Sequence, residues 1–353
     1  MPNLFDPAML GNIALSNRVV MAPMTRSRAG EGDVPTDLHV AYYRQRASAG
    51  LIITEGTQPS ANGKGYCRTP GIHDAAQIEA WKSVTDAVHG AGGRIVMQIM
   101  HVGRVASQLN KAEGTESVAP SAIRAAGQIF TEQGMVDLDE PRALDIAEIP
   151  GVIAEFAEAT RNALAAGCDG VELHCTSGYL PAQFLSSNSN QRIDAYGGSA
   201  QNRIRFVVEA LTAMAAVAGP GRVGFRICPG NPFNDIHDAD PVETYGALLE
   251  AVAPMGLAYL HLIDVPNPQL DSLALVRERW TGNLILNRDE MPAEVAQELV
   301  ETGGATAISF GRRFIANPDF VERLQSGAAL NAIDFNTLYT PGAEGFTDYP
   351  ALA

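Results

Sequence analysis

Basic residues are scarce in this sequence of 353 residues, in which 25 lysines and arginines stand against 40 aspartates and glutamates and give a formal net charge of −15. Because no basic run occurs, we expect neither a nucleic acid nor an anionic membrane surface as a partner. No apolar run approaches the roughly 18 residues that a membrane helix needs. The opening stretch MPNLFDPAMLGN also lacks the basic and apolar regions of a signal peptide. These absences predict a cytoplasmic globular protein.

Several motifs that would specify other chemistry are also missing. The four cysteines form no Cys-x-x-Cys pair, which argues against a zinc ribbon or an iron–sulfur site and favours buried, reduced thiols. No Gly-x-Ser-x-Gly elbow is present, so serine hydrolysis lacks its usual anchor. The acidic stretch NDIHDADP is rich in turn formers and predicts a loop rather than a metal site. We therefore expect no metal.

What the sequence does contain is a repeated unit, in which glycine-rich punctuation precedes a short apolar run and a polar residue or glycine follows it. Such runs are apolar on both faces, as is typical of parallel strands buried under helices. The eight instances cover residues 18–26, 48–56, 90–101, 165–174, 219–226, 254–264, 281–287 and 301–312.

Helical periodicity separates these expected strands. It covers residues 77–89, 153–165, 203–215, 242–252 and 293–301, with Gly167 placed as the stop of the second helix. Eight strands alternating with helices predict an α/β fold, a single (β/α)₈ barrel over residues 1–353. A doubly wound open sheet is the alternative, and it is disfavoured because no G-x-G-x-x-G follows the first strand.

Two segments lie outside the repeat. Residues 1–17 are expected to cap the bottom of the barrel. Residues 105–147, rich in Ala, Gly, Glu and Pro, form an insertion after the third strand. Loops after barrel strands lie on the catalytic face, so this insertion is expected to form a lid or a pocket wall.

In such barrels, chemistry belongs to the carboxyl ends of the strands. The stretch Ser309-Phe310-Gly311-Arg312 ends the eighth strand, and we expect Asn317 and Pro318 to begin the next helix as N-cap and first residue. Gly311 would let backbone N–H groups approach an oxyanion, and Arg312 would add a charge-assisted fork. This pattern indicates a phosphate site, and an ordinary barrel closure with a surface arginine is the alternative.

Longer motifs resemble the Old Yellow Enzyme family of FMN-dependent ene-reductases along nearly the whole chain. They are NRVVMAPMTR (17–26), GYCRTPGIH (65–73), QIMHVGR (98–104), VELHCTSGYLPAQFLSSNSNQRIDAYGGS (171–199), SFGRRFIANPDFVERL (309–324) and AEGFTDYP (343–350). The long central motif is the most specific. The resemblance implies non-covalently bound FMN across the barrel mouth, NAD(P)H as reductant, a small-molecule substrate, and a monomer or homo-oligomer.

The resemblance also implies the cofactor contacts. The flavin edge would meet Pro23, Met24 and Thr25, with the Thr25 hydroxyl near O4 and N5 and therefore counted among the catalytic groups. The pyrimidine side would meet Gly56 and Gln98, with Arg226 near N1 and O2, and His174 is also counted among the cofactor contacts. The phosphate would be held by Asn287, Arg288, Gly311 and Arg312, of which Arg288 is an approximate match.

For the substrate, the resemblance implies that His174 polarises the oxygen of an α,β-unsaturated carbonyl or nitroalkene while Tyr179 protonates the α carbon. Nitrate esters and nitro compounds would be further hydride acceptors. Tyr66 and Tyr339 match pocket-lining tyrosines of the family. Two substrate-binding positions depart from its pattern, because Ser177 replaces a histidine or asparagine and Met100 replaces a frequent tryptophan. Both changes predict a roomier site.

Two other functions stay open on the residues alone. One is a flavin-free barrel lyase or isomerase that binds a phosphorylated substrate through the Arg312 loop. The other is a flavin-binding sensor or storage protein without turnover, against which the Tyr179 proton donor argues.

Overall fold

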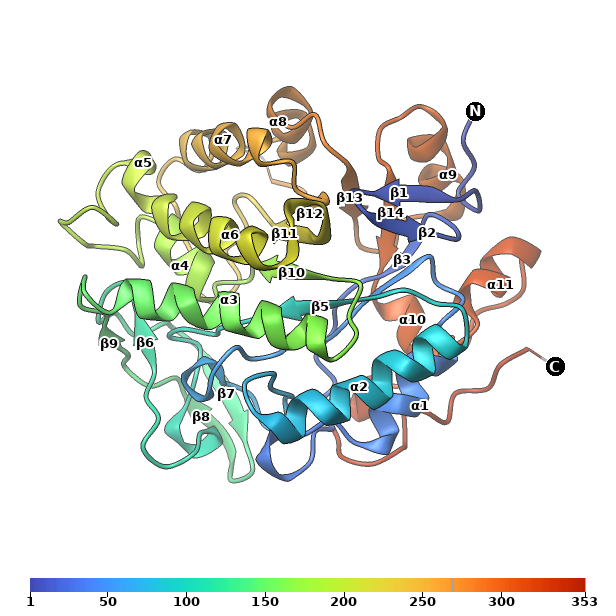
Figure 1. Ribbon diagram of the computed structural model, residues 1–353, viewed down its shortest axis with the longest axis horizontal. Helices are drawn as coiled ribbons and strands as arrows, with labels where there is room; N and C mark the ends of the chain where they lie inside the picture. The colour runs from blue at the N-terminus through green and yellow to red at the C-terminus, as the bar shows by residue number, and fades with distance from the viewer. Residues whose placement is uncertain (268–269, 353) are drawn as a thin grey trace.

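Eight parallel strands close into a barrel in the computed structural model, which describes residues 1–267 and 270–352 (Figure 1). Neighbours in the barrel follow chain order, and the ring closes where Ile308 of the last strand pairs with Val19 of the first. The strands are β3 (Val19–Met21), β4 (Leu51–Ile53), β5 (Ile95–Ile99), β10 (Gly170–His174), β11 (Val223–Ile227), β12 (Tyr259–Ile263), β13 (Leu284–Asn287) and β14 (Ala307–Phe310). The predicted (β/α)₈ barrel is confirmed, and the open-sheet alternative is wrong.

Helices surround the barrel. They are α1 (Asp37–Gln45), α2 (Ala75–Gly90), α3 (Ile149–Ala165), α5 (Ala200–Arg203), α6 (Arg205–Ala218), α7 (Pro241–Val252), α8 (Ser272–Arg279), α9 (Ala293–Glu301) and α11 (Phe320–Ser326). Four predicted helices lie within α2, α3, α7 and α9. The fifth, at 203–215, is wrong at its start, because the helical stretch begins at Ala200 and is interrupted at Ile204. Gly167 has φ +90°, the left-handed conformation that favours glycine after a helix end.

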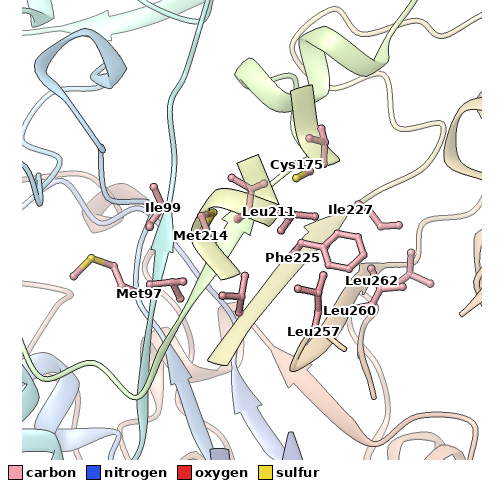
Figure 2. Close-up of a cluster of buried hydrophobic side chains, with 14 of the residues drawn as sticks. Met97, Ile99, Cys175, Leu211, Met214, Phe225, Ile227, Leu257, Leu260 and Leu262 are labelled. Atoms are coloured by element: carbon pink, nitrogen blue, oxygen red, sulfur yellow. The ribbon is translucent and has the colours of Figure 1, made fainter. Parts of the chain in front are cut away.

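Outward-facing strand residues form the largest apolar core, beneath the helices. Figure 2 shows part of it, where side chains of β5, β11 and β12 lie with two residues of α6. Each of these side chains is almost completely buried, and burial of a large apolar side chain contributes about 1.5–3 kcal/mol. The labelled members from these elements are Met97, Ile99, Leu211, Met214, Phe225, Ile227, Leu260 and Leu262.

A hairpin of β1 (Ala8–Leu10) and β2 (Ile13–Leu15) covers the amino-terminal end of the barrel. Its apolar side chains join the inner core, which includes Val20 and Ile285. The backbone N–H of Asn12 donates to the Gly221 carbonyl at 2.8 Å. Gly11 has φ +56°, and an added Cβ would lie 2.4 Å from that same carbonyl oxygen, so the turn requires glycine.

The insertion lies between β5 and α3, as expected. It contains a parallel pair, β6 (Val118–Ala119) with β9 (Arg142–Ala143), and an antiparallel hairpin, β7 (Gln128–Thr131) with β8 (Gly134–Asp137). Over the described residues, no helix has both the length and the apolar character to cross a membrane.

Candidate active site

A layer of four hydrogen-bonded polar side chains fills the barrel interior one level below its carboxyl end. We call Gln98, Glu172, His261 and Ser309 the inner polar layer. Gln98 Nε2 donates to Glu172 Oε1 at 2.7 Å, His261 Nδ1 lies 2.9 Å from Glu172 Oε2, and His261 Nε2 lies 2.8 Å from Ser309 Oγ. β10, β12 and β14 are not neighbours, so these contacts cross the interior. All four side chains are buried.

Above this layer lie the side chains of the barrel mouth, His174, Arg226 and Asn287. Successive residues of a strand point to opposite faces, so His174, two residues after Glu172, also points inward. Arg226 Nη2 donates to Asn287 Oδ1 at 3.2 Å, between β11 and β13, and Asn287 Nδ2 donates to the Ser309 carbonyl at 2.9 Å.

Two buried nitrogens at the mouth, His174 Nδ1 and Arg226 Nε, have no hydrogen-bond partner within the described part of the chain. Burial, and then the neighbouring charge of Arg226, holds the pKa of His174 well below its ordinary value, so the imidazole is neutral. Burial also lowers the pKa of Arg226. Buried polar atoms are normally paired, so the mouth is suited to a polar ligand that meets both groups.

Tyr179 stands beside His174. The chain turns sharply after β10, with Ser177 at φ +58° and Gly178 at φ +72°, and Tyr179 then begins α4 (Leu180–Leu185). The turn brings the two rings to a centroid distance of 5.0 Å, edge to face. Burial and the nearby Tyr66 hold the pKa of Tyr179 well above its ordinary value, so the phenol stays protonated.

A cavity of about 470 Å³ lies beside the mouth, along the carboxyl ends of β3, β11, β13 and β14. It holds nine of the residues that the sequence predicts for the site. They are Pro23, Met24, Thr25, Arg226, Asn287, Arg288, Gly311, Arg312 and Tyr339.

The expected phosphate end of this cavity is rich in charge. Arg288 pairs with Asp264, and Arg312 lies 3.3 Å from Asp289, so both guanidinium groups face carboxylates. The predicted helix start at Asn317 is wrong. A short helix, α10 (Arg312–Ala316), follows Gly311 directly, so Asn317 ends it, and Asp319 precedes α11.

A second cavity, of about 670 Å³, adjoins the first. The two share Thr25, Phe335 and Tyr339 in their walls. Tyr66 and Tyr179 line the second cavity, and the insertion hairpin contributes Ile129, Phe130 and Met135. Within the insertion, the cavity is lined by residues between 128 and 135, and three of these side chains are apolar.

Five predicted residues, Gly56, Gln98, Met100, His174 and Ser177, line neither cavity and lie deeper or to one side. Met100 covers Gly56, because an added Cβ at Gly56 would lie 2.5 Å from the Met100 sulfur. Asn234 Nδ2 donates to the Ser177 carbonyl at 2.7 Å.

In the carboxyl-terminal wall, the sequence predicted Tyr339 but neither Phe335 nor the arginine that holds this segment in place. Arg28 donates to the Thr337, Leu338 and Glu344 carbonyls at 2.7, 2.6 and 2.9 Å, and so fixes the segment that carries Phe335 and Tyr339. The motif PMTRSR contains Arg26 and Arg28, but nothing in a sequence shows that carbonyls more than 300 residues later accept their hydrogen bonds.

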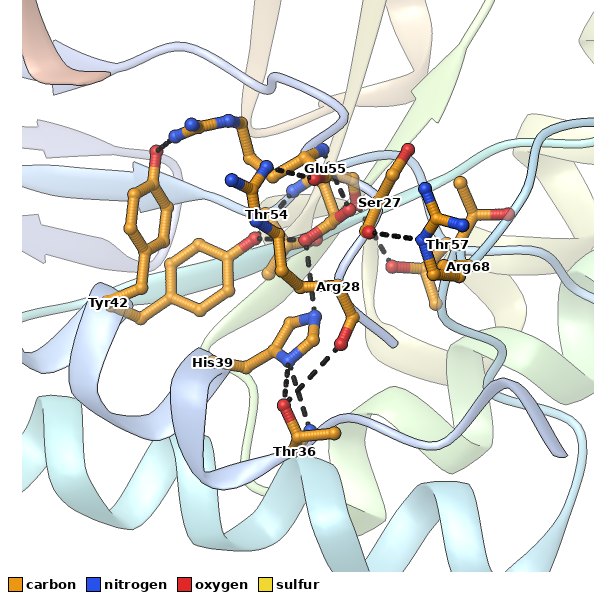
Figure 3. Close-up of polar contacts among 12 residues, drawn as sticks. Ser27, Arg28, Thr36, His39, Tyr42, Thr54, Glu55, Thr57 and Arg68 are labelled. Carbon is orange, nitrogen blue, oxygen red and sulfur yellow. Dashed lines mark hydrogen bonds and ion pairs between the residues drawn. The ribbon is translucent and has the colours of Figure 1, made fainter. Parts of the chain in front are cut away.

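Beneath this wall, polar side chains gather around the buried carboxyl of Glu55, as Figure 3 shows. The backbone N–H of Arg26 donates to Glu55 Oε2 at 3.1 Å, and His39 Nε2 lies 3.5 Å from Glu55 Oε1. This cluster connects the loop after β3, which carries Thr25, with α1.

Comparison with known proteins agrees with this geometry. The model of the NADH:flavin oxidoreductase / NADH oxidase family matches residues 3–331. A probable flavin mononucleotide-dependent alkene reductase of Leishmania infantum is 41% identical, over 99% of this chain and 97% of that protein. The 12-oxophytodienoate reductase 1 of Oryza sativa subsp. japonica is 38% identical, over 99% of this chain and 93% of that protein.

Solved structures give the same result. Morphinone reductase is 44% identical and superposes with a TM-score of 0.94, over 99% of this chain and 96% of that one. The Old Yellow Enzyme homologue of Zymomonas mobilis is 38% identical, with a TM-score of 0.96 over 99% of this chain and 100% of that one. The chain belongs to the NADH:flavin oxidoreductase / NADH oxidase family and is an FMN-dependent oxidoreductase of the Old Yellow Enzyme type.

Proposed function

We propose that this enzyme reduces the C=C bond of α,β-unsaturated carbonyl compounds and nitroalkenes, with His174 binding the substrate oxygen and Tyr179 supplying a proton. Family membership makes FMN the cofactor and a nicotinamide the reductant. It also removes the flavin-free lyase or isomerase from consideration. The observation that carries the proposal is the pairing of His174 and Tyr179, whose rings lie 5.0 Å apart between the mouth and the apolar cavity.

The residues around the first cavity fit the cofactor. FMN held in this cavity would supply the hydride-transfer chemistry between the nicotinamide and the alkene. Arg226 brings positive charge to the mouth, and its Nε is free to donate. Pro23, Met24 and Thr25 form one wall of the same cavity. We assign the phosphate to Asn287, Arg288, Gly311 and Arg312, and the arginines would exchange their present carboxylate partners for it.

His174 acts in this proposal as a neutral hydrogen-bond donor. Its lowered pKa keeps a single N–H on the ring at physiological pH, and burial strengthens the bond that this group makes. Donation to a carbonyl or nitro oxygen withdraws electron density from the alkene, which makes the β carbon a better hydride acceptor.

Tyr179 completes the addition. Its raised pKa keeps the phenol protonated, and the developing carbanion at the α carbon is basic enough to take that proton. The hydroxyl of Tyr66 lies 3.0 Å from that of Tyr179 and can hydrogen-bond to the oxygen left behind. The phenol then takes a proton back from water.

The size of the second cavity supports bulky alkenes as substrates. Its apolar wall includes Phe130, Met135 and Phe233, each about half exposed. The relatives named above include a 12-oxophytodienoate reductase and a morphinone reductase. Exposed apolar groups of this kind are expected to bind the substrate body rather than its activating group.

The test is an anaerobic two-step reaction of the purified holoenzyme. NADPH should bleach the flavin absorbance, and 2-cyclohexenone should restore it. Tyr179→Phe should leave the bleaching unchanged and slow the return about 10²–10⁴-fold, the usual contribution of a general acid. Ferricyanide, which needs no proton on carbon, should reoxidise the variant at the wild-type rate. A flavin that no alkene reoxidises would instead indicate a sensor or storage protein.

A further inference from the structure

The inner polar layer contains a buried carboxyl to which the proposed reaction assigns no role. Glu172 has no exposed surface and accepts hydrogen bonds from Gln98 and His261. It lies two residues before His174 on the same face of β10, directly below the barrel mouth. Burying a charge is costly unless its surroundings compensate, so a carboxylate at this position needs an explanation.

Glu172 determines how the Gln98 side-chain amide is oriented. An ionised carboxylate can only accept, so the Gln98 side chain must direct its NH₂ group toward Glu172. The amide oxygen of Gln98 is therefore left for a partner other than Glu172. Through this bond, Glu172 determines which end of the Gln98 amide a ligand at the mouth meets.

Glu172 has a second effect, which comes from its charge. Burial and the charge of Arg226 lower the pKa of His261 to about 4, so His261 is neutral and donates through one nitrogen. Burial acts to raise the pKa of Glu172, but the electrostatic interaction and hydrogen bond with His261, and then the charge of Arg226, hold that pKa below its usual range. The inner polar layer therefore carries one negative charge, which opposes the positive charge of Arg226 in a medium of low dielectric constant.

We infer that Glu172 is a positioning residue that orients the Gln98 amide toward bound FMN and lowers the reduction potential of the flavin by opposing the field of Arg226. The inference rests on the proposed placement of the flavin at the mouth. A flavin gains negative charge when it is reduced, so a buried anion below it disfavours the reduced form. A lower potential favours hydride delivery to the alkene and disfavours hydride uptake from the nicotinamide.

Glu172→Gln in the holoenzyme tests the inference because it removes the charge and keeps the size. His261 can still donate to the new amide oxygen, so the new NH₂ group forces the Gln98 amide to turn over. We expect the equilibrium to shift at least tenfold toward reduced flavin, which is about 30 mV for a two-electron couple. FMN should also dissociate more readily. Reduction by NADPH should become faster and reoxidation by 2-cyclohexenone slower.

Ser309→Ala is the matched control, because Ser309 belongs to the same layer and carries no charge. Its potential should stay within a few millivolts of the wild-type value, a shift too small to change the equilibrium twofold. His261→Leu is a second way to neutralise the layer, since a buried carboxyl without its donor favours the protonated form. It should raise the potential in the same direction even if Glu172→Gln does not fold.

Faster reduction by NADPH together with slower reoxidation by 2-cyclohexenone separates this inference from a merely structural role of Glu172, which would slow both half-reactions. An unchanged potential in a Glu172→Gln enzyme that still binds FMN would overturn the inference, as would equal slowing of both half-reactions. The proposed function is judged separately, on the wild-type enzyme, by whether the alkene restores the flavin absorbance.

Discussion

The hydroxyl groups of Tyr66 and Tyr179 lie 3.0 Å apart, with the rings edge to face at a centroid distance of 6.3 Å. Tyr66 follows β4 and Tyr179 follows β10. The barrel therefore brings together one residue that precedes the insertion in the sequence and one that comes after it. Burial raises the pKa of both phenols. The pair therefore holds both protons near neutral pH and supports Tyr179 as an acid.

Tyr66→Phe should weaken this support without removing the acid. A lost hydrogen bond of about 1 kcal/mol corresponds to roughly fivefold slower reoxidation by 2-cyclohexenone, a smaller loss than Tyr179→Phe should cause. Stopped-flow absorbance measures the rate, and reduction by NADPH should not change. Tyr196→Phe is the control, because its hydroxyl bonds Glu209 away from both cavities. A Tyr66→Phe enzyme as slow as Tyr179→Phe would make Tyr66 the acid instead.

Ser177→Asn should strengthen the binding of substrate oxygen. Ser177 has φ +58°, a conformation that asparagine tolerates better than most residues, so the backbone should not change. The longer side chain adds an NH₂ donor near His174. We expect several-fold tighter binding of phenolic ligands, followed by the change in flavin absorbance, because one hydrogen bond contributes about 1 kcal/mol. Equal affinities together with unchanged enone selectivity would contradict a role for this position.

Arg28→Met should loosen the carboxyl-terminal wall of the cavities. The substitution removes the guanidinium that donates to the Thr337, Leu338 and Glu344 carbonyls. The Leu338 carbonyl keeps Arg26 as a second donor. We expect unfolding free energy to fall by about 3 kcal/mol and KM to rise more than kcat falls. Urea unfolding, steady-state kinetics and proteolysis of the carboxyl-terminal segment measure these effects. Arg44→Met, on the exposed face of α1, should change none of them.

The Glu55 and His39 pair predicts a pH effect on stability. Burial raises the pKa of Glu55 to about 7, so between pH 4.5 and 7 the folded carboxyl holds a proton that the unfolded one has lost, and its contribution to stability falls as pH rises. Burial lowers the pKa of His39 to about 4, so its contribution rises between pH 4 and 6.5. The two contributions oppose each other in the wild type.

Glu55→Gln should expose the His39 contribution. The variant's unfolding free energy minus that of the wild type should be about 2 kcal/mol larger at pH 7 than at pH 5, because one pKa unit corresponds to about 1.4 kcal/mol. Urea unfolding at both pH values measures the difference. If wild type and variant differ by the same amount at pH 5 and pH 7, Glu55 does not take up a proton on folding in this range.

Most of the fold could be predicted from local patterns of apolar residues and glycine. Apolar runs bounded by glycine identify parallel strands because both faces of a barrel strand are buried, and this holds for all eight strands. Helix ends were less predictable. The misplaced start at Asn317 arose because Gly311 is followed directly by α10, which the sequence reading did not include.

Some features of the site could likewise be predicted from the sequence, and others could not. His174 and Tyr179 are five positions apart, so one turn joins them and their association could be read from the sequence. Glu172 shares the strand face of His174, and alternation along β10 could have identified it as an interior residue. Its contacts with Gln98 and His261 come from other strands and could not have been identified in that way.

The sequence by itself determined the (β/α)₈ barrel, the family and the residues at the strand ends, because each depends on local periodicity or on contiguous motifs. Only the tertiary structure decided which charges meet. The closed ring joins Glu172 to His261, and the return of the chain end places Tyr339 in the wall of the same cavity as Thr25. These contacts depend on barrel closure and on hydrogen bonds between distant segments, which no local pattern encodes.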